Sequence, residues 1–400
     1  MKRILCSVLL VSALAACTET TTVPADVRVT ETGSSQAAIK IGPAVPVASV
    51  EELYAAVNNT ANTDAQLILA PGTYTLSTTS GGVARPNGGR LELQPGMAIA
   101  GVPGDRSAVV IDMSLLPVAS FNASLGKSGG IRLGRGRNAV QWMTIVGNSN
   151  AAASIETDLA DSHATQVIIA HIATHGSIRG IDVRNVGVAM SGRTIVARID
   201  DTELYGGNEG IRLLNLNGAV GAQIDVMMTG NRVHDNTNGC IIEHNRASSG
   251  VIRVRSSGDR FEHNALGCLI GGGLVAAPGE ANSNETVFEA YGDAFIDNTL
   301  AVPSIDYGGV LVLGAETPGV ANSSSHNTVS VSFTGTKVSG NQNVDFQAYG
   351  ARSTASPAGI SGVGNQVSIE LQGVSKKIEV DAVGSLPLEG AGTNTVTVNR

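Results

Sequence analysis

The segment Asn231–Asn245 gathers several residue types that can transfer protons or bind metals. Its sequence, NRVHDNTNGCIIEHN, holds two histidines, an aspartate, a glutamate and a cysteine within fifteen residues. Imidazole, thiolate and carboxylate groups are the usual zinc ligands, and they also serve as general acids and bases. The segment is therefore either a catalytic or metal site, or one unit of a repeat whose polar side chains face water.

A short sequence motif recurs along the chain about every 28 residues. In NRVHDNTNGCII and DRFEHNALGCLI an apolar residue stands seven positions before a cysteine, and these cysteines, Cys240 and Cys268, are 28 residues apart. Ile211 occupies the same place 29 residues before Cys240. Further copies include Ile145, Ile172, Phe295 and Gly309–Val312. Three strands of about five residues at roughly 3.3 Å each, joined by three corners, make one coil of a solenoid with this period.

The composition favours strands over helices. Among 400 residues there are 49 glycines, 3% aromatic residues and 15% charged residues, which is typical of a chain that turns often and builds strands. One helix is expected, because Ser49–Glu52 fits a capping box and begins an apolar stripe at helical spacing that runs to about Asn59. An apolar strand and a Pro-Gly turn follow directly in LILAPGTYTL.

This helix, the LILAPGTYTL segment and the repeat resemble the right-handed parallel β-helix proteins of the pectin-lyase-like superfamily. In those proteins the helix plugs one end of the coil. The resemblance implies an all-β fold, a right-handed parallel β-helix of three-strand coils, and we expect roughly nine or ten turns. The expected order is a signal peptide at 1–16, a flexible tether at 17–48, the capping helix at 49–62 and the β-helix at 63–400.

The N-terminus has the features of a bacterial lipoprotein signal. Lys2 and Arg3 precede an apolar run that is too short to remain as a membrane span. Leu14–Cys17 resembles the lipobox, in which a diacylglycerol is attached to the cysteine before cleavage. The position after Cys17 holds Thr18 and not the aspartate associated with inner-membrane retention, so we expect an outer-membrane lipoprotein of the bacterial cell envelope. The alternative is a plain signal peptide in which Cys17 is incidental.

The charge of the mature chain argues against nucleic acid as a partner. Removal of residues 1–16 leaves 24 basic residues against 34 acidic ones, a net charge of −10. A net acidic protein is a poor general binder of nucleic acid and of anionic lipid surfaces. The expected link to the membrane is therefore the lipid at Cys17, and the sequence does not indicate an oligomeric state.

Alternation within the repeat predicts which side chains face the core. The inward pairs are Ile131/Leu133, Ile155/Thr157, Ile181/Val183, Ile211/Leu213, Cys240/Ile242, Cys268/Ile270 and Val310/Val312. Cys240 and Cys268 should then be adjacent, as a disulfide or as stacked thiols. We favour stacked thiols, because parallel neighbours keep their Cβ atoms roughly 4.8 Å apart, against about 3.8 Å in a disulfide.

An asparagine recurs three residues after the apolar anchor of the repeat. The positions are Asn148, Asn236, Asn264, Asn298 and Asn341, whereas Asn208 falls one residue late. Asparagine tolerates left-handed backbone and bonds to neighbouring main chain. We expect these side chains to stack at one corner of the coil.

The outward positions of the same strands carry charge. One column runs Arg132, Glu156, Asp182, Arg212, Ile241, Leu269 and Leu311, and a second column holds Arg184 and Glu243. Asp182, Arg184, Arg212 and Glu243 should converge over about three coils. In pectate-lyase-like enzymes such a face carries basic residues that neutralise a uronate and abstract its proton, with acidic residues holding calcium. The resemblance thus implies these four as candidate catalytic residues, and the alternative is a ladder of mutually offsetting charges.

The opening segment does not assemble a metal site. His234 and Asp235 belong to one strand of the coil and Glu243 and His244 to the next, and the repeat aligns His234 with Tyr205 and Glu262. Zinc needs three or four convergent ligands, so we expect no metal. The segment NTNG is similar to the Asn-Thr-Asp-Gly of polygalacturonases, but Asn238 replaces the carboxylate that inverting hydrolysis requires.

Two functions are compatible with these patterns. The first is a lipid-anchored envelope protein that binds or scaffolds, presenting a rigid face to a polysaccharide or another envelope component. The alternative is a polysaccharide lyase or hydrolase acting on acidic glycans, with no cofactor except calcium in the case of a lyase. Low aromatic content weakens sugar stacking in either case.

Overall fold

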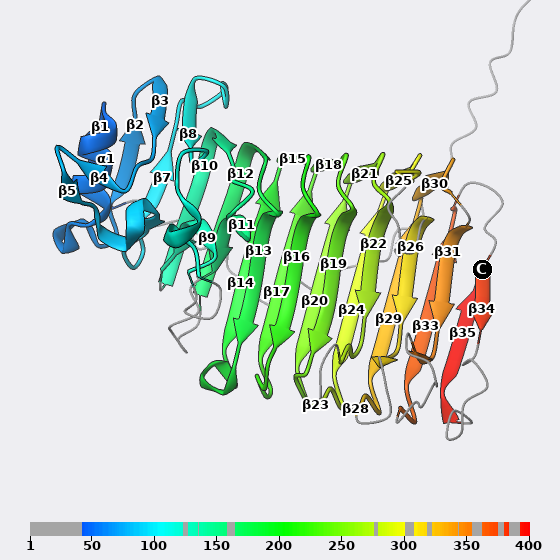
Figure 1. The fold of residues 1–400 in the computed structure, drawn as a ribbon. Helices are drawn as coiled ribbons and strands as arrows, with labels where there is room; N and C mark the ends of the chain where they lie inside the picture. Colours follow the sequence, from blue (N-terminus) through cyan, green and yellow to red (C-terminus); the bar gives the residue numbers. More distant parts are fainter. Residues whose placement is uncertain are drawn as a thin grey trace, which may run out of the picture. The chain divides into compact units, whose positions relative to one another are not determined.

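The chain winds as a right-handed parallel β-helix, seen in Figure 1 as stacked strands that follow one another in sequence. The computed structural model describes residues 42–400, apart from 123–126, 135, 158–164, 276–278, 301–307, 318–321, 343, 354–361, 375–379 and 384–392. Within these residues two parallel sheets, one of ten strands and one of nineteen, form the walls. The predicted fold class and the predicted nine or ten turns are confirmed.

The ten-stranded sheet takes one strand from each coil. In chain order its strands are β6 (Leu91–Glu92), β9 (Gly129–Leu133), β11 (Ala153–Thr157), β13 (Arg179–Val186), β16 (Glu209–Leu216), β19 (Asn238–Asn245), β22 (Leu266–Gly271), β26 (Gly308–Leu313), β31 (Val344–Tyr349) and β34 (Val380–Val383). Every pairing in it is parallel and joins strands of successive coils. This sheet therefore displays the repeat directly.

The nineteen-stranded sheet holds the other strands of each coil. Its first strands are β1 (Ala44–Val47), β2 (Gln66–Leu69), β3 (Gly72–Thr75), β7 (Ala98–Ala100), β8 (Val109–Asp112), β10 (Gly136–Val146) and β12 (Thr165–His175). Long strands continue as β14 (Thr194–Asp200), β17 (Gln223–Thr229), β20 (Val251–Ser257), β24 (Glu285–Tyr291), β29 (Thr328–Thr334), β33 (Gln366–Gln372) and β35 (Thr395–Asn399). Short strands stack beside them as β15 (Glu203–Tyr205), β18 (Arg232–His234), β21 (Arg260–Glu262), β25 (Ala294–Ile296) and β30 (Lys337–Ser339).

A few short elements decorate the coils. The two-stranded sheets are β4 (Thr79–Ser80) with β5 (Val83–Ala84), β23 (Gly279–Glu280) with β28 (Asn322–Ser323), and β27 (Glu316–Thr317) with β32 (Arg352–Ser353). The 3-10 helices are η1 (Thr60–Asn62), η2 (Pro86–Gly89), η3 (Val118–Ser120) and η5 (Val188–Met190).

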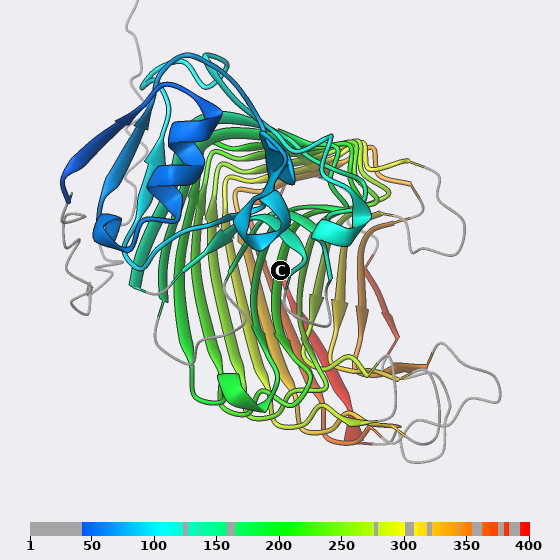
Figure 2. The same ribbon diagram turned by 60° about the vertical axis from the view of Figure 1, so that its left-hand side comes forward.

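The predicted capping helix is present as α1 (Val50–Val57), which Figure 2 shows beside the first strands of the stack. The Ser49 hydroxyl accepts from the Glu52 amide at 3.2 Å, as in a capping box, whereas the Glu52 carboxylate accepts from the amide of Ala48, one residue before the N-cap, at 2.6 Å. Leu53 and Val57 are fully buried in the core. The helix thus closes the apolar end of the first coil.

The predicted tether needs one correction at its end. Ala44–Val47, assigned to the tether, forms β1 and pairs in parallel with β2, because its alternating apolar residues complete the first coil. The signal peptide, Cys17 and the tether up to residue 41 lie outside the described residues. No helix in the described part of the chain is long and apolar enough to cross a membrane.

The register confirms the repeat and the inward columns. Ile211, Cys240 and Cys268 are direct partners across β16, β19 and β22, and all three are completely buried. The same holds for the alternate positions Leu213, Ile242 and Ile270. Period-two alternation thus decides which face of each strand joins the core.

Cys240 and Cys268 form a disulfide, so the favoured reading of stacked thiols is wrong. Their Cα atoms are 4.5 Å apart, closer than the roughly 4.8 Å strand spacing assumed from the sequence. This separation lies within the usual range of about 4.4–6.8 Å for disulfides. The bond closes a loop of one coil inside the core.

The predicted asparagine stack is confirmed for four of its five members. The Asn264 side-chain oxygen accepts from the amide of Asn236 at 3.0 Å, and the same contact repeats through Asn298 and Asn341. Asn148 instead donates to the carbonyls of Met113, Ser114 and Leu116. A second ladder, Asn284, Asn327, Asn365 and Asn394, was not predicted. Both ladders pair backbone groups at corners where the strands end.

Candidate functional site

Three of the four predicted catalytic residues contact one another on the outward face of the ten-stranded sheet. Asp182 on β13 is the direct partner of Arg212 on β16. The Arg212 guanidinium donates to the two oxygens of Asp182 at 3.2 and 3.0 Å. Arg184 reaches the same carboxylate from its own strand at 3.3 Å. The structure therefore brings Asp182, Arg184 and Arg212 together as the sequence predicted.

This group extends into a buried network that leaves Asp182 no exposed surface. Arg184 pairs with Glu156 on β11 at 2.6 Å and also donates to the Ser128 hydroxyl. The side chains of Asp182 and Glu156 are 0% exposed, and that of Arg184 is 6% exposed. Burial raises the pKa of Asp182, but Arg184, Arg212 and Arg179 outweigh it and lower this pKa to about 2. An ionised, fully paired carboxylate is what a charge ladder requires.

Glu243 lies one coil beyond Arg212. The register runs from Arg184 through Leu214 to Glu243, so two coils separate their side chains. Burial raises the pKa of Glu243 to about 7, with Arg212 opposing the shift and Glu316 and Glu209 adding to it. No ion pair involves Glu243 among the described residues. The four candidates lie on three successive coils, as predicted, and their catalytic role stays a prediction.

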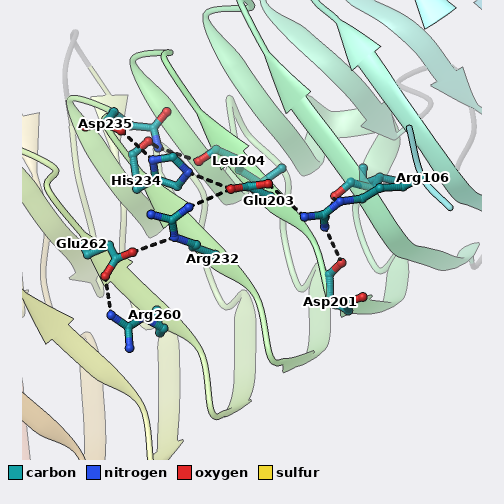
Figure 3. A network of polar contacts seen from close by, with 11 residues as sticks. Arg106, Asp201, Glu203, Leu204, Arg232, His234, Asp235, Arg260 and Glu262 are labelled. Carbon is teal, nitrogen blue, oxygen red and sulfur yellow. Dashed lines mark hydrogen bonds and ion pairs between the residues drawn. The ribbon is translucent and has the colours of Figure 1, made fainter. Parts of the chain in front are cut away.

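A second charge network lies on and beside the short strands (Figure 3), and its arginines are partly exposed to solvent. We call it the exposed network; its members are Arg106, Asp201, Glu203, Arg232, His234, Asp235, Arg260 and Glu262. Arg232 bridges Glu203 at 2.8 Å and Glu262 at 2.7 Å. The side chains of Arg106, Arg232 and Arg260 are 35, 46 and 52% exposed. These groups can therefore meet a ligand.

The network alternates in charge along the coil axis. Arg106 pairs with Glu203 at 2.9 Å, and Arg260 pairs with Glu262 at 2.6 Å. Both nitrogens of the His234 ring face carboxylates, Asp235 at 2.6 Å and Glu203 at 3.3 Å. Burial raises the pKa of Glu203, but hydrogen bonds from His234 and Arg232 outweigh it and lower this pKa. The carboxylate of Glu203 is thus held ionised between three donors.

Aromatic rings stack beside this network on successive coils. The rings of His175, Tyr205 and His234 are spaced 5.0 and 5.1 Å apart and nearly parallel. At the preceding corner Trp142 stacks on His171 at 3.9 Å, and the His171 ring contacts Asp201 at 2.8 Å. Because neighbouring rings cover both faces of Tyr205, it offers a ligand its edge and hydroxyl.

Sequence reasoning found only part of this site. The predicted alignment of His234 with Tyr205 and Glu262 is confirmed by the register. The charged residues one position before each apolar anchor, Glu203, Arg232 and Arg260, were missed, although their identical place in the repeat is a usable signal. Arg106 carries no such signal, because it lies 97 residues before its partner Glu203.

Two other kinds of site were considered, a metal-binding cluster and a surface hollow. Within the described ranges no cluster of three or more His, Cys, Asp or Glu side chains could hold a metal ion, and the calcium expected for a lyase stays an untested prediction. An open hollow of about 400 Å³ lies at another corner. It is lined by Asn217, Gly218, Val220, Arg246, Ser248, Gly279 and Glu280. None of the predicted site residues borders it.

Comparisons with known proteins identify similar folds. No protein-family model and no curated protein matches the sequence. Similar solved structures include the A-module of the mannuronan C-5 epimerase AlgE6 from Azotobacter vinelandii, at 15% identity over 88% of this chain and 93% of that chain, with a TM-score of 0.41. Pectate lyase Pel9A matches at 14% identity over 89% and 88%, with a TM-score of 0.37. DFA-IIIase from Arthrobacter chlorophenolicus A6 matches at 11% identity over 89% and 90%, with a TM-score of 0.31. No activity or residue role is transferred from them.

Proposed function

We propose that this protein binds a polysaccharide through the exposed network, as a binding or scaffold protein of the bacterial cell envelope. The observation that carries the proposal is the row of partly exposed guanidinium groups over successive coils, with the carboxylate of Glu203 24% exposed among them. Coils repeat at about 4.8 Å, close to the length of one sugar ring, so a repeating polar face suits a repeating polar polymer. Planar groups that donate and accept hydrogen bonds suit its hydroxyl groups.

Solvent exposure distinguishes this face from the buried network. Both networks contain arginine paired with carboxylate, but Asp182 and Glu156 are fully buried whereas Arg232 is 46% exposed. The short strands that carry the exposed network are fixed by parallel pairing and by the asparagine ladder that begins at Asn236. A rigid face loses little conformational entropy when it binds a ligand.

Binding should depend on Arg232 in particular, because its guanidinium lies at the centre of the row. We expect Arg232→Ala to weaken binding to the recognised polysaccharide about tenfold, the effect of losing about 1.4 kcal/mol of hydrogen bonding. Affinity electrophoresis against a panel of plant and bacterial polysaccharides measures this. Arg255→Ala is the matched control, because Arg255 is 55% exposed and paired with Glu289 on a long strand. Equal losses in both variants, or no binding to any polymer, would contradict the proposal.

The same panel tests the alternative of a lyase. Uronate polysaccharides are incubated with the protein and calcium, and the absorbance of unsaturated chain ends is followed. We expect none, because Asp182 has no exposed surface through which to reach a substrate. New absorbance that Arg212→Ala abolishes, in a variant shown to be folded, would instead support Asp182, Arg184, Arg212 and Glu243 as catalytic residues.

We also infer that a lipid on Cys17 anchors the protein to the outer membrane. The support is the lipobox resemblance and the short apolar run before it. Expressed in a bacterium, the protein should partition into the detergent phase of a Triton X-114 extract. Cys17→Ala should move it to the aqueous phase, whereas Cys6→Ala, within the same signal, should leave it with the detergent. Detergent partitioning that survives Cys17→Ala would rule out this anchor.

A further inference from the structure

We propose that the ligand of the exposed network is an uncharged polysaccharide rather than a polyuronate, lying along β15, β18 and β21. This inference rests on the proposed binding function and names its ligand class. Three features of the network lead to it: the state of its arginines, its balance of charge, and the hydrogen-bonding edges beside it.

The arginines of the network are already neutralised. Arg106 is bound to Glu203, Arg232 to both Glu203 and Glu262, and Arg260 to Glu262, all at 2.6–2.9 Å. A uronate carboxylate that accepted from these arginines would lie beside Glu203 or Glu262 and be repelled by their charge. A second nitrogen of Arg106, not used in its ion pair, donates only to the carbonyls of Ile172 and Asp201, both at 3.4 Å. Neutral hydroxyl oxygens can share these donors without breaking a pair.

The balance of charge also disfavours a polyanion. Two further carboxylates, Asp201 and Asp235, are 64 and 61% exposed at the edges of the network. Four carboxylates stand against three guanidinium groups and the His234 ring, both nitrogens of which face carboxylates, so the network has no net positive charge that would attract a polyanion. The whole chain is acidic as well, with a formal net charge of −8. A negatively charged polymer would approach this face against an unfavourable potential.

Hydroxyl groups match the observed alternation of donors and acceptors. A sugar hydroxyl donates one hydrogen bond and accepts others, so adjacent hydroxyls can bind a carboxylate and a guanidinium at the same time. Tyr205 is partly buried between the rings of His175 and His234. Its ring faces are covered, so recognition depends on hydrogen bonds at the edge rather than on stacking against sugar faces.

The test is a binding titration of the full-length protein against two sets of polymers. The neutral set is a glucan, a mannan and an arabinogalactan, and the uronate set is alginate and polygalacturonate. We expect a neutral polymer to bind, with an affinity that changes less than twofold between 50 and 500 mM NaCl. Glu203→Gln should weaken binding about tenfold, whereas Glu289→Gln, its counterpart in the Arg255 pair on a long strand, should not.

The possible outcomes separate the two proposals. Tighter binding of a uronate polymer, steeply weakened by salt and by Arg232→Ala, would overturn the ligand class and leave the binding function standing. Binding of neither set would overturn the binding function, and the ligand class with it. If Glu203→Gln unfolds at the same temperature as wild type, its weaker binding reflects a lost contact and not a damaged fold.

Discussion

Asp293→Asn should gain stability relative to wild type as the pH rises, by about 3 kcal/mol in free energy of unfolding between pH 5 and pH 8. Asp293 and Asp259 are stacked on successive coils and are 1% and 0% exposed. The Asp293 side chain accepts from the Asp259 amide at 3.0 Å. Asparagine can keep that contact and carries no charge at any of these pH values.

The geometry around Ser256 indicates that the two aspartates share a proton. The Ser256 hydroxyl oxygen lies 2.5 Å from one oxygen of Asp259 and is also hydrogen-bonded to Asp293. A hydroxyl group has one proton to donate, so one of the two carboxyl groups must donate in return. The other Asp259 oxygen accepts from the amide and side chain of Asn231 at 2.7 and 2.9 Å.

Burial and repulsion hold that proton well above the pH at which an aspartate ordinarily loses it. Burial raises the pKa of Asp293 to about 7, and the Asp259 carboxylate adds to the shift. Burial likewise raises the pKa of Asp259 to about 6, and Asp200, itself paired with Arg198, adds repulsion. Unfolded aspartate loses its proton near pH 3.9, so between that value and pH 7 the folded state binds more protons. Stability therefore falls as the pH rises, by about 1.4 kcal/mol per pH unit for one proton.

Chemical denaturation of wild type and of Asp293→Asn at several pH values between 5 and 8 measures the difference in their free energies of unfolding. Glu243 and His244, with pKa values of about 7 and about 4, contribute equally to both proteins. Asp297→Asn is the control, because Asp297 is exposed four residues further along, and its difference from wild type should stay constant. A constant difference for Asp293→Asn as well would show that no proton is shared.

Arg184→Ala should cost about 3–5 kcal/mol of folding free energy, the usual effect of removing one partner from a buried ion pair. Arg184 contacts Glu156, Asp182 and Ser128, and the first two carboxylates are completely buried. Without Arg184, Glu156 loses its ion pair with that arginine. Asp182 keeps its ion pair with Arg212. The buried network is thus expected to support the fold.

Urea denaturation at pH 7 measures this loss. Arg255→Ala serves as control, since an exposed pair contributes about 0–1 kcal/mol. If Arg184→Ala unfolds like wild type, the network is not needed for stability, and the catalytic prediction for Asp182 and Arg184 gains weight. A large loss identifies these residues as structural.

Much of the fold follows from the spacing of a few residues. The 28-residue offset of Cys240 and Cys268 predicted their direct pairing, and alternation predicted that both face the core. The asparagine positions predicted a corner ladder, because each coil must pair its backbone groups at the same corner. The column Arg132, Glu156, Asp182 and Arg212 was also predicted correctly, since side-chain direction follows from strand register alone.

Details that depend on small distances were harder to predict. The disulfide differs from the expected stacked thiols because the two Cα atoms lie 4.5 Å apart, slightly closer than regular strand spacing. Arg184 and Glu243 share a column, as predicted, but Leu214 lies between them, so their side chains are two coils apart. A repeat defines which column a residue joins and leaves the distances within that column open.

The sequence by itself determined the coil, its register and the direction of each side chain, because these follow from local periodicity in a chain that pairs with its own next turn. Only the tertiary structure decided which charges are buried and which can meet a ligand. Ser128 and Arg184 contact the buried Glu156 from positions 28 residues away on either side, while Arg106 reaches Glu203 across 97 residues and Arg232 is 46% exposed. Burial depends on such distant partners, and no local pattern records them.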